Sequence, residues 1–312
     1  MSTPFGSEKI IKQQISETEL NTYLVGFDIN DKGEKEYRWK DLVNKIMSAL
    51  HEFAFGIHNG EQTLNTETYQ KISEAANSIY KIHGFQKVRD TYFNGGYIAD
   101  DVKDKYLRRG EFGELILHLL LRDFYHTIPL LSKIYFKDSI GHTVHGFDAI
   151  HIQPDTKTLW LGESKLYIDG KNGVKALIED IMEHFKQDYL NNEFTLVSKK
   201  IKLFDNILEK EYWLDLMDGC TKLSEKLNSI TIPLLCVYSS DNFTSYNDET
   251  AADFIREYEK EVRTLKKYFD DNNCHPLKTR LNILLILFPV KCKKELVKKL
   301  HRKLSLAQQL MD

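Results

Sequence analysis

The fold is decided by one stretch of the chain, His145-Gly-Phe-Asp-Ala-Ile-His-Ile-Gln-Pro-Asp-Thr-Lys-Thr-Leu-Trp-Leu-Gly-Glu-Ser-Lys-Leu-Tyr-Ile168. Two apolar-rich runs flank a turn-forming segment at 153–157, so the stretch predicts a β-hairpin. If the turn is centred between Asp155 and Thr156, Asp148 lies directly opposite Glu163, because each is seven residues from the central pair. The two carboxylates would then be neighbours across the hairpin.

Lys165 follows Glu163 by two residues, so both side chains project from the same face of their strand. Two acids and a lysine would therefore share a sheet face where a structural core carries Val or Ile. This arrangement predicts a metal-dependent phosphodiesterase centre. The alternative is a surface hairpin with ordinary charges, in which Lys165 pairs with Glu163 or Asp148.

The chemistry explains why these residue types are needed. Mg²⁺ takes oxygen ligands and usually uses one or two carboxylates together with water and phosphate oxygens. Asp148 and Glu163 would supply the carboxylates, and the backbone carbonyl of Ser164 a third oxygen. Lys165 would orient the attacking water or offset charge that develops on the phosphate. We therefore expect Mg²⁺ or Mn²⁺ as the cofactor.

Asp155 is an alternative to Asp148 as the partner of Glu163, because Pro154-Asp155 followed by Glu163-Ser-Lys165 gives the pattern P-D…E-x-K. In the hairpin, however, Asp155 occupies the turn, eight residues from Glu163. At about 3.3 Å per strand residue, the two carboxylates would be roughly 25 Å apart. Asp155 is therefore interpreted as a turn residue, and Asp148 as the partner of Glu163.

Residues 108–125 predict a buried helix, because apolar side chains occupy most of its sides. Glu111, Glu114 and His118 nevertheless form one stripe along it. Glu114 would add a further acid to the metal site, in part through water, although the choice between Glu111 and Glu114 is open. The alternative places both glutamates in an exposed first turn, beside the helix dipole or the preceding arginines. Close approach to this helix would be allowed by two glycines, Gly110 and Gly113.

The element order resembles the core of the PD-(D/E)xK, or restriction-endonuclease-like, nucleases. It comprises the helix with Glu114, a strand at 130–136, the two hairpin strands and a helix at 174–185. One departure is Phe147, which stands where this superfamily often has proline. The resemblance implies an α/β fold with a mixed sheet flanked by helices. Two late apolar runs, 230–238 and 281–288, would extend that sheet, with Pro233 weakening one end of the first.

Four further runs narrow the resemblance: R-R-G-E-F-G-E, G-F-D-A-I, G-E-S-K and I-L-F-P-V. Together they resemble the HamA family, the nuclease subunits of the bacterial Hachiman anti-phage defence system. The resemblance implies a partner helicase, HamB, that restrains and licenses the nuclease, and DNA as the target. It also implies that Glu163 and Lys165 are the essential catalytic pair. Two other interpretations stay open, a non-catalytic DNA-binding or scaffold subunit and a DNA-repair nuclease.

Composition restricts how DNA could be bound. The 312-residue chain is 42% hydrophobic and 29% charged, which is ordinary for a globular protein, and its formal net charge is −3. Nucleic-acid contacts must therefore come from local patches. One candidate is the run 291–303, which has seven Lys or Arg against one Glu, although a solvated helix face is the simpler interpretation. Further candidates follow the catalytic strand: Lys171, Lys175, Lys186 and Gln187.

The remaining features set the expected context. No paired spacing is found among Cys220, Cys236, Cys274 and Cys292, which indicates a reducing, cytoplasmic setting. The first nine residues do not resemble a signal peptide, and no apolar run reaches the roughly 18 residues of a membrane helix. No phosphate-binding loop motif occurs, so ATP use would belong to a partner. A zinc site is disfavoured because nothing nearby completes a ligand set from His142, His145 and His151. We expect a mainly helical N-terminal region at 1–95 and a nuclease-like domain at 96–312.

Overall fold

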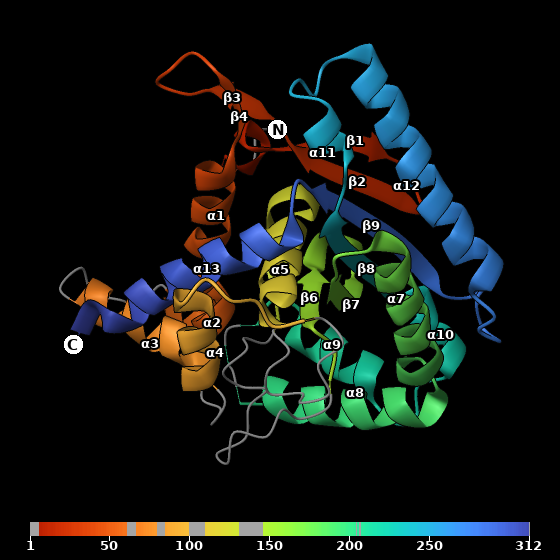
Figure 1. Ribbon diagram of the computed structural model, residues 1–312. Helices are drawn as coiled ribbons and strands as arrows, with labels where there is room; N and C mark the ends of the chain where they lie inside the picture. Colours follow the sequence, from red (N-terminus) through yellow and green to blue (C-terminus); the bar gives the residue numbers. More distant parts are fainter. Residues whose placement is uncertain are drawn as a thin grey trace.

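The computed structural model describes residues 6–60, 67–79, 85–99, 110–130, 146–203, 205 and 207–311. Its centre is a seven-stranded sheet in the order β1-β2-β9-β8-β7-β6-β5 (Figure 1). These strands are β1 (Ile11–Ser16), β2 (Leu20–Val25), β5 (Ile128–Pro129), β6 (Ala149–Gln153), β7 (Thr158–Leu166), β8 (Ile230–Ser239) and β9 (Asn282–Val290). A separate two-stranded ribbon pairs β3 (Phe27–Ile29) with β4 (Lys35–Tyr37).

The sheet is mixed. Strands β7, β8, β9 and β2 run parallel, while β5, β6 and β1 pair with their neighbours in antiparallel fashion. The two late apolar runs become β8 and β9, which lie inside the sheet with nearly every residue buried. Helices cover both faces of parallel strands, so such strands are apolar throughout rather than alternating. The prediction that they extend the core sheet is confirmed.

The hairpin has the register that the sequence predicts. Ala149 pairs with Gly162 and Gln153 with Thr158, so Asp148, the residue before β6, stands at the position opposite Glu163. The turn is a short 3-10 helix, Pro154–Thr156, followed by Lys157 in a left-handed conformation. Asp155 is exposed in this turn, which confirms that it belongs to the turn.

Helices cover the sheet on both faces (Figure 1). One face is packed by α5 (Glu111–Tyr125) and α13 (Lys293–Gln308), with α1 (Trp39–Ser48), α2 (Leu50–Gly60), α3 (Thr68–Ile79) and α4 (Phe85–Phe93) beyond them. The other face carries α7 (Gly170–His184) and α12 (Ala252–Asn272). Further helices are α8 (Gln187–Ile201), α9 (Lys210–Met217), α10 (Leu223–Asn228) and α11 (Asn242–Ser245). Within the described ranges, none of these helices is both long and apolar enough to span a membrane.

The N-terminal segment is part of the same sheet. Its strand β2 pairs directly with β9, and β3 follows after Gly26. The segment continues through the helices α1, α2 and α3. The strand expected at 130–136 lies, except for Leu130, outside the described residues. The proposed domain boundary near residue 95 stays a prediction.

Pro233 lies inside the sheet rather than weakening an end of β8, which continues through it. The reason is local space. The β7–β8 pairs that flank Pro233 are Trp160 with Thr231 and Glu163 with Leu234. Between them, β7 carries Gly162 beside the proline. A Cβ on Gly162 would come within 3.1 Å of the Pro233 ring and 2.8 Å of Leu117. Glycine at this position therefore lets α5 and β8 approach β7 immediately before Glu163.

A buried polar chain joins α5 to the N-terminal segment. The Arg122 guanidinium donates to Glu52 on α2 and to Asp123, whose carboxylate also accepts from the Ser7 hydroxyl. Burial alone would raise the pKa of Glu52, but His118 and Arg122 outweigh burial and lower that pKa to about 2. These charges are largely removed from water, so each depends on its partners.

Replacing Arg122 by Met should therefore destabilise the protein strongly. The change leaves Asp123, which is fully buried, without its cation, and breaking such a pair costs about 3–5 kcal/mol. Urea unfolding followed by circular dichroism measures this loss. Arg263→Met is the matched control, because Arg263 pairs with Glu17 at the surface and its removal should change stability little. Equal effects of the two substitutions would contradict the account.

Candidate metal centre

The β7 strand presents alternate residues to two different helices. Glu163 and Lys165 project toward α7, whereas Ser164 projects toward α5. A Cβ on Gly113 of α5 would lie 3.0 Å from Ser164 Oγ, so this glycine allows the close approach that the sequence predicts. Gly110 has open space around it instead. Because successive side chains of a strand point to opposite faces, Glu163 and Lys165 lie on one face of the sheet and the Ser164–Gly113 contact on the other.

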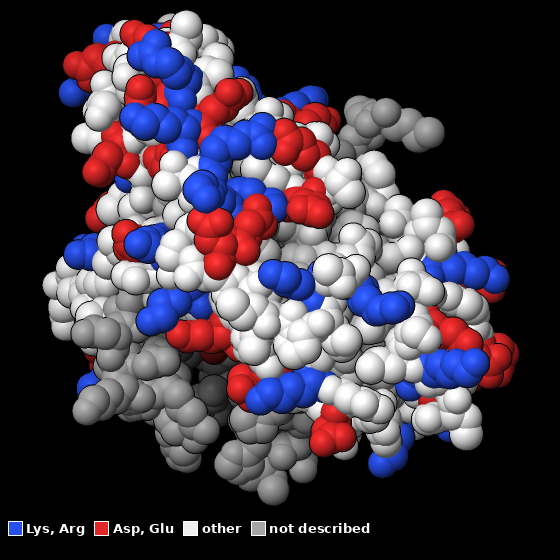
Figure 2. All heavy atoms as spheres, turned by 90° about the vertical axis from the view of Figure 1, so that its right-hand side faces the viewer, with Lys and Arg blue, Asp and Glu red and all other residues white. Residues whose placement is uncertain are grey.

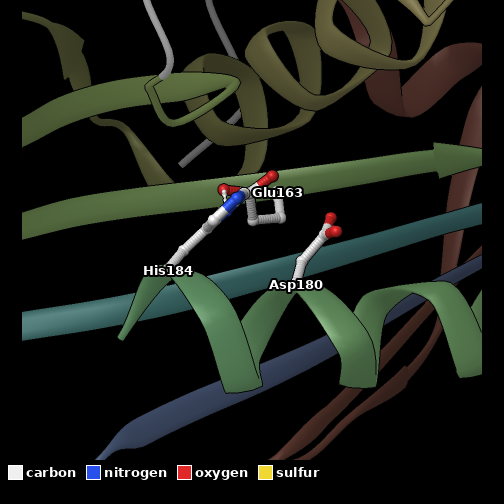
Figure 3. A group of neighbouring side chains, drawn as sticks. All are labelled: Glu163, Asp180 and His184. Carbon is white, nitrogen blue, oxygen red and sulfur yellow. Dashed lines mark hydrogen bonds and ion pairs between the residues drawn. The ribbon is translucent and has the colours of Figure 1, made fainter. Parts of the chain in front are cut away.

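Glu163 is almost fully enclosed, with 2% of its surface exposed. His184, at the end of α7, places Nδ1 2.6 Å from Glu163 Oε1. Asp180 lies one turn earlier on the same helix. One potential ligand atom from each of these three residues lies within 4.8 Å of the others (Figure 3). The side chains of α7 and β7 thus meet at one point between helix and sheet.

Lys165 finds its partner on α7. Its ammonium forms an ion pair with Asp180, not with Glu163 or Asp148 as the surface-hairpin alternative would have it. Burial alone would lower the pKa of Lys165, but Asp180, Asp148 and Glu163 outweigh burial and raise it. The lysine is therefore held as a cation beside the carboxylates.

Asp148 reaches β7 from the opposite strand. Its Oδ2 accepts hydrogen bonds from the Ser164 backbone N–H and from Ser164 Oγ, both at 2.8 Å. The prediction that Asp148 and Glu163 are neighbours across the hairpin agrees with these contacts. The proposed role of the Ser164 carbonyl as a metal ligand stays a prediction.

The electrostatics of Glu163 show how many acids surround it. Burial raises its pKa well above the ordinary value, and Asp148, Asp180 and Glu114 raise it further, while Lys165 opposes them. Three carboxylates thus act on the buried Glu163, and a single lysine opposes them. Burying several negative charges together is unfavourable unless a cation or protons compensate them.

Two residues of the predicted stripe on α5, Glu114 and His118, have different surroundings. Glu114 is buried, not in an exposed first turn, and it is close enough to raise the Glu163 pKa. His118 instead contacts His151 of β6, with 3.2 Å between their ring nitrogens. His151 also pairs with Thr127 at 2.8 Å, and burial lowers its pKa well below the ordinary value. Four residues of the sequence analysis lie outside the described residues: Arg108, Arg109, His142 and His145.

Asp180 and His184 are the site residues that the sequence reasoning missed. They are four residues apart, beside the buried positions Leu177 and Ile181 of α7. That spacing on the helix after the catalytic strand could have identified them. Tyr189 of α8 stacks on the His184 ring, with ring centroids 4.6 Å apart and an interplanar angle of 15°.

This donor set fits a divalent metal ion. Carboxylate oxygens suit Mg²⁺ and Mn²⁺, and Glu163 and Asp180 provide them from β7 and α7. Asp148 is close enough to raise the Glu163 pKa, but its Oδ2 accepts hydrogen bonds from Ser164. The imidazole of His184 suits softer transition metals better. His184 contacts Glu163 Oε1, so it can orient that carboxylate instead of binding the metal ion.

The lysines proposed to contact DNA have local partners. Lys186 pairs with Glu183 at 2.8 Å and Lys175 with Glu179 at 3.9 Å, whereas Lys171 lies over the Tyr268 ring. Basic and acidic side chains intermix on the face that looks out from the right-hand side of Figure 1 (Figure 2). The proposed role of these lysines and of Gln187 in DNA binding stays a prediction.

Glu193 of α8 should make stability depend on pH. Burial raises its pKa to about 7, with His184 opposing. A raised carboxyl pKa gives stabilisation that is complete below about pH 4.5 and is lost as pH rises through about 7. Glu193→Gln should therefore gain stability relative to the native chain above pH 7.

Urea unfolding at about pH 5 and about pH 8, with EDTA present, measures this difference. Each unit of pKa shift corresponds to about 1.4 kcal/mol. Glu179→Gln, on the exposed face of α7, is the control and should leave the pH dependence unchanged. An identical pH profile for Glu193→Gln and the native chain would exclude this role.

Comparison with known proteins assigns the chain to a family. Residues 3–304 match the HamA family, which covers nearly the whole length. A search of curated proteins gives no match. The family match agrees with the resemblance carried by the sequence motifs around Glu111, Asp148 and Glu163. The chain therefore belongs to the HamA family, a component of the Hachiman defence system.

Proposed function

We propose that this chain is a metal-dependent DNA nuclease that acts as the effector of a defence complex with a helicase partner. One observation carries the proposal. Asp148 stands opposite Glu163 across a hairpin, and Lys165 projects from the same face as Glu163. Asp180 and His184 meet Glu163 from α7. A purely structural core has no use for three acids at this point.

The order of elements supports the same class of enzyme. Helix α5 precedes three antiparallel strands, β5 to β7, and α7 follows β7 directly. After α8, α9 and α10 the chain enters β8, which lies parallel beside β7. This is the order expected of a restriction-endonuclease-like core, and we propose that the sheet belongs to that fold. The acids lie where the hairpin ends and α7 crosses β7.

The proposed mechanism gives each residue a separate task. Asp148, Glu163 and Asp180 would hold the metal ion, with Glu114 adding a carboxylate through water. A bound Mg²⁺ or Mn²⁺ would polarise the phosphate and lower the pKa of water. Because the pKa of Lys165 is raised, the lysine stays protonated and offers positive charge to the phosphate rather than acting as a base.

Glu163 gives the site a pH dependence of its own. Its raised pKa means that, without a cation, the carboxyl tends to hold a proton. Binding a cation must release that proton, so metal affinity should increase with pH. His184 would keep the carboxylate oriented through its contact with Oε1.

Two observations support a helicase partner: the sequence lacks a phosphate-binding loop motif, and the chain belongs to the HamA family. The sequence contains no phosphate-binding loop, so ATP-driven work would belong to another subunit. The HamA match supports a Hachiman complex and therefore a defence role rather than a repair role. DNA as substrate and a HamB-like helicase as partner are parts of this proposal.

In the complex with the helicase, Glu163→Ala combined with Lys165→Ala should abolish DNA cleavage. Loss of a metal ligand and of the positive charge should reduce the rate by at least about a hundredfold. A plasmid cleavage assay with Mg²⁺ measures it. Asp155→Ala is the matched control, since Asp155 sits in the exposed turn and should retain full activity. Cleavage that survives in the double variant would falsify the proposal.

Metal binding should depend on the same carboxylates without any DNA present. Calorimetric titration of the isolated chain with Mn²⁺ should show binding that weakens at least about tenfold in Asp148→Asn and Asp180→Asn. Glu183→Gln, on the exposed side of α7, should bind Mn²⁺ as the native chain does. A chain with no measurable Mn²⁺ affinity would favour a non-catalytic DNA-binding or scaffold subunit.

A further inference from the structure

A pocket lies between α4 and α13. These two helices are on the opposite side of the sheet from α7 (Figure 1). Its volume is about 430 Å³, which falls within the range of small-molecule sites. Its walls include Tyr92, Phe93, Lys298, Lys299, Arg302 and Ser305. None of these residues belongs to the proposed metal centre.

The aromatic wall is firmly supported. Tyr92 stacks on His301 of α13, with ring centroids 4.1 Å apart and an interplanar angle of 19°. His301 in turn packs edge-on against Phe112 of α5 at 5.0 Å. Phe93, beside this stack, has 58% of its surface exposed. The pocket therefore has an exposed aromatic ring next to a fixed one.

The opposite wall is basic. Lys298 and Arg302 are four residues apart on α13, so they lie on one side of the helix about 6 Å apart along its axis, and Lys299 also lines the pocket. The acid among the lining residues is Glu295, 3.8 Å from Lys298. Three cations against one acid make this pocket positive, although the whole chain carries a net charge of −3.

A polar group inside the pocket is also unsatisfied. Ser305 is buried, and its Oγ has no hydrogen-bond partner among the residues that the structure describes. A buried hydroxyl without a partner is uncommon, because losing water without replacement is costly. A ligand with a hydrogen-bonding group would satisfy it.

We propose that this pocket binds a nucleotide unit of single-stranded nucleic acid. Lys298, Lys299 and Arg302 would hold its phosphates, and Phe93 would stack on its base. Basic side chains together with an exposed aromatic ring are the features that bind single strands without sequence preference. A base inside a duplex is already stacked and paired, so it cannot use Phe93 in this way.

The pocket is connected to the metal centre through α5. Phe112, which contacts the pocket wall, is two residues from Glu114, and the adjacent Gly113 packs on β7. Helix α5 thus contacts both the pocket wall and the strand that carries Glu163. If the proposed nuclease activity holds, a strand held here would extend toward that centre. Binding at the pocket itself does not rest on that activity.

Fluorescence anisotropy with a labelled thymidine oligomer of about 20 nucleotides tests the proposal. EDTA in the buffer keeps metal chemistry out of the measurement. Phe93→Ala should weaken binding about tenfold, as loss of one stacked base does. Lys298→Gln combined with Arg302→Gln should weaken it at least as much and flatten its salt dependence.

Two controls separate specific effects from general ones. Arg256→Gln with Lys260→Gln removes the same charge from exposed positions of α12 and should leave affinity nearly unchanged. Asp155→Asn, in the exposed turn of the hairpin, should also bind the oligomer normally. Because binding is measured in EDTA, a failed nuclease proposal would not affect this result. Circular dichroism and thermal unfolding confirm that each variant is folded.

Three outcomes would overturn the proposal. Unchanged oligomer affinity in both folded pocket variants would exclude a binding site here. A loss with the charge variant but none with Phe93→Ala would leave only a phosphate site. Pocket variants that bind the oligomer normally but no longer bind the helicase would assign this surface to the partner protein.

Discussion

The burial of the Glu163 carboxylate is the constraint on which the rest of the site depends. A carboxylate held away from water among three other acids is unfavourable unless something positive compensates it. Lys165 supplies one charge and is itself tied to Asp180, while His184 contacts Glu163 directly. The helix α7, the hairpin and the first turn of α5 are all brought together around this one group.

The hairpin could be predicted from sequence because its information is local. The turn residues at 154–157 fix the register, and the register alone makes Asp148 the neighbour of Glu163 and excludes Asp155. The strands β8 and β9 were equally predictable, since strands buried on both faces are apolar along their whole length. Pro233 was misjudged because its tolerance comes from Gly162 on another strand.

The remaining site residues depend on tertiary packing. Asp180 and His184 look like ordinary charges of an amphipathic helix, and only the angle at which α7 crosses β7 gives them a role. His118 shared a helical stripe with Glu114, yet its partner His151 is supplied by a neighbouring strand. Sequence periodicity identifies the face of a helix, but not which element will cover it.

The pairing of β2 with β9 has a consequence for how the protein is made. Strand β2 ends at Val25 and β9 begins at Asn282, and β9 lies between β2 and β8 in the sheet. The two parts of the sheet therefore cannot join until β9 has left the ribosome. Until then β8 and β2 each have an open edge, and such edges invite pairing with other chains. A truncated product lacking β9 would therefore be prone to aggregate.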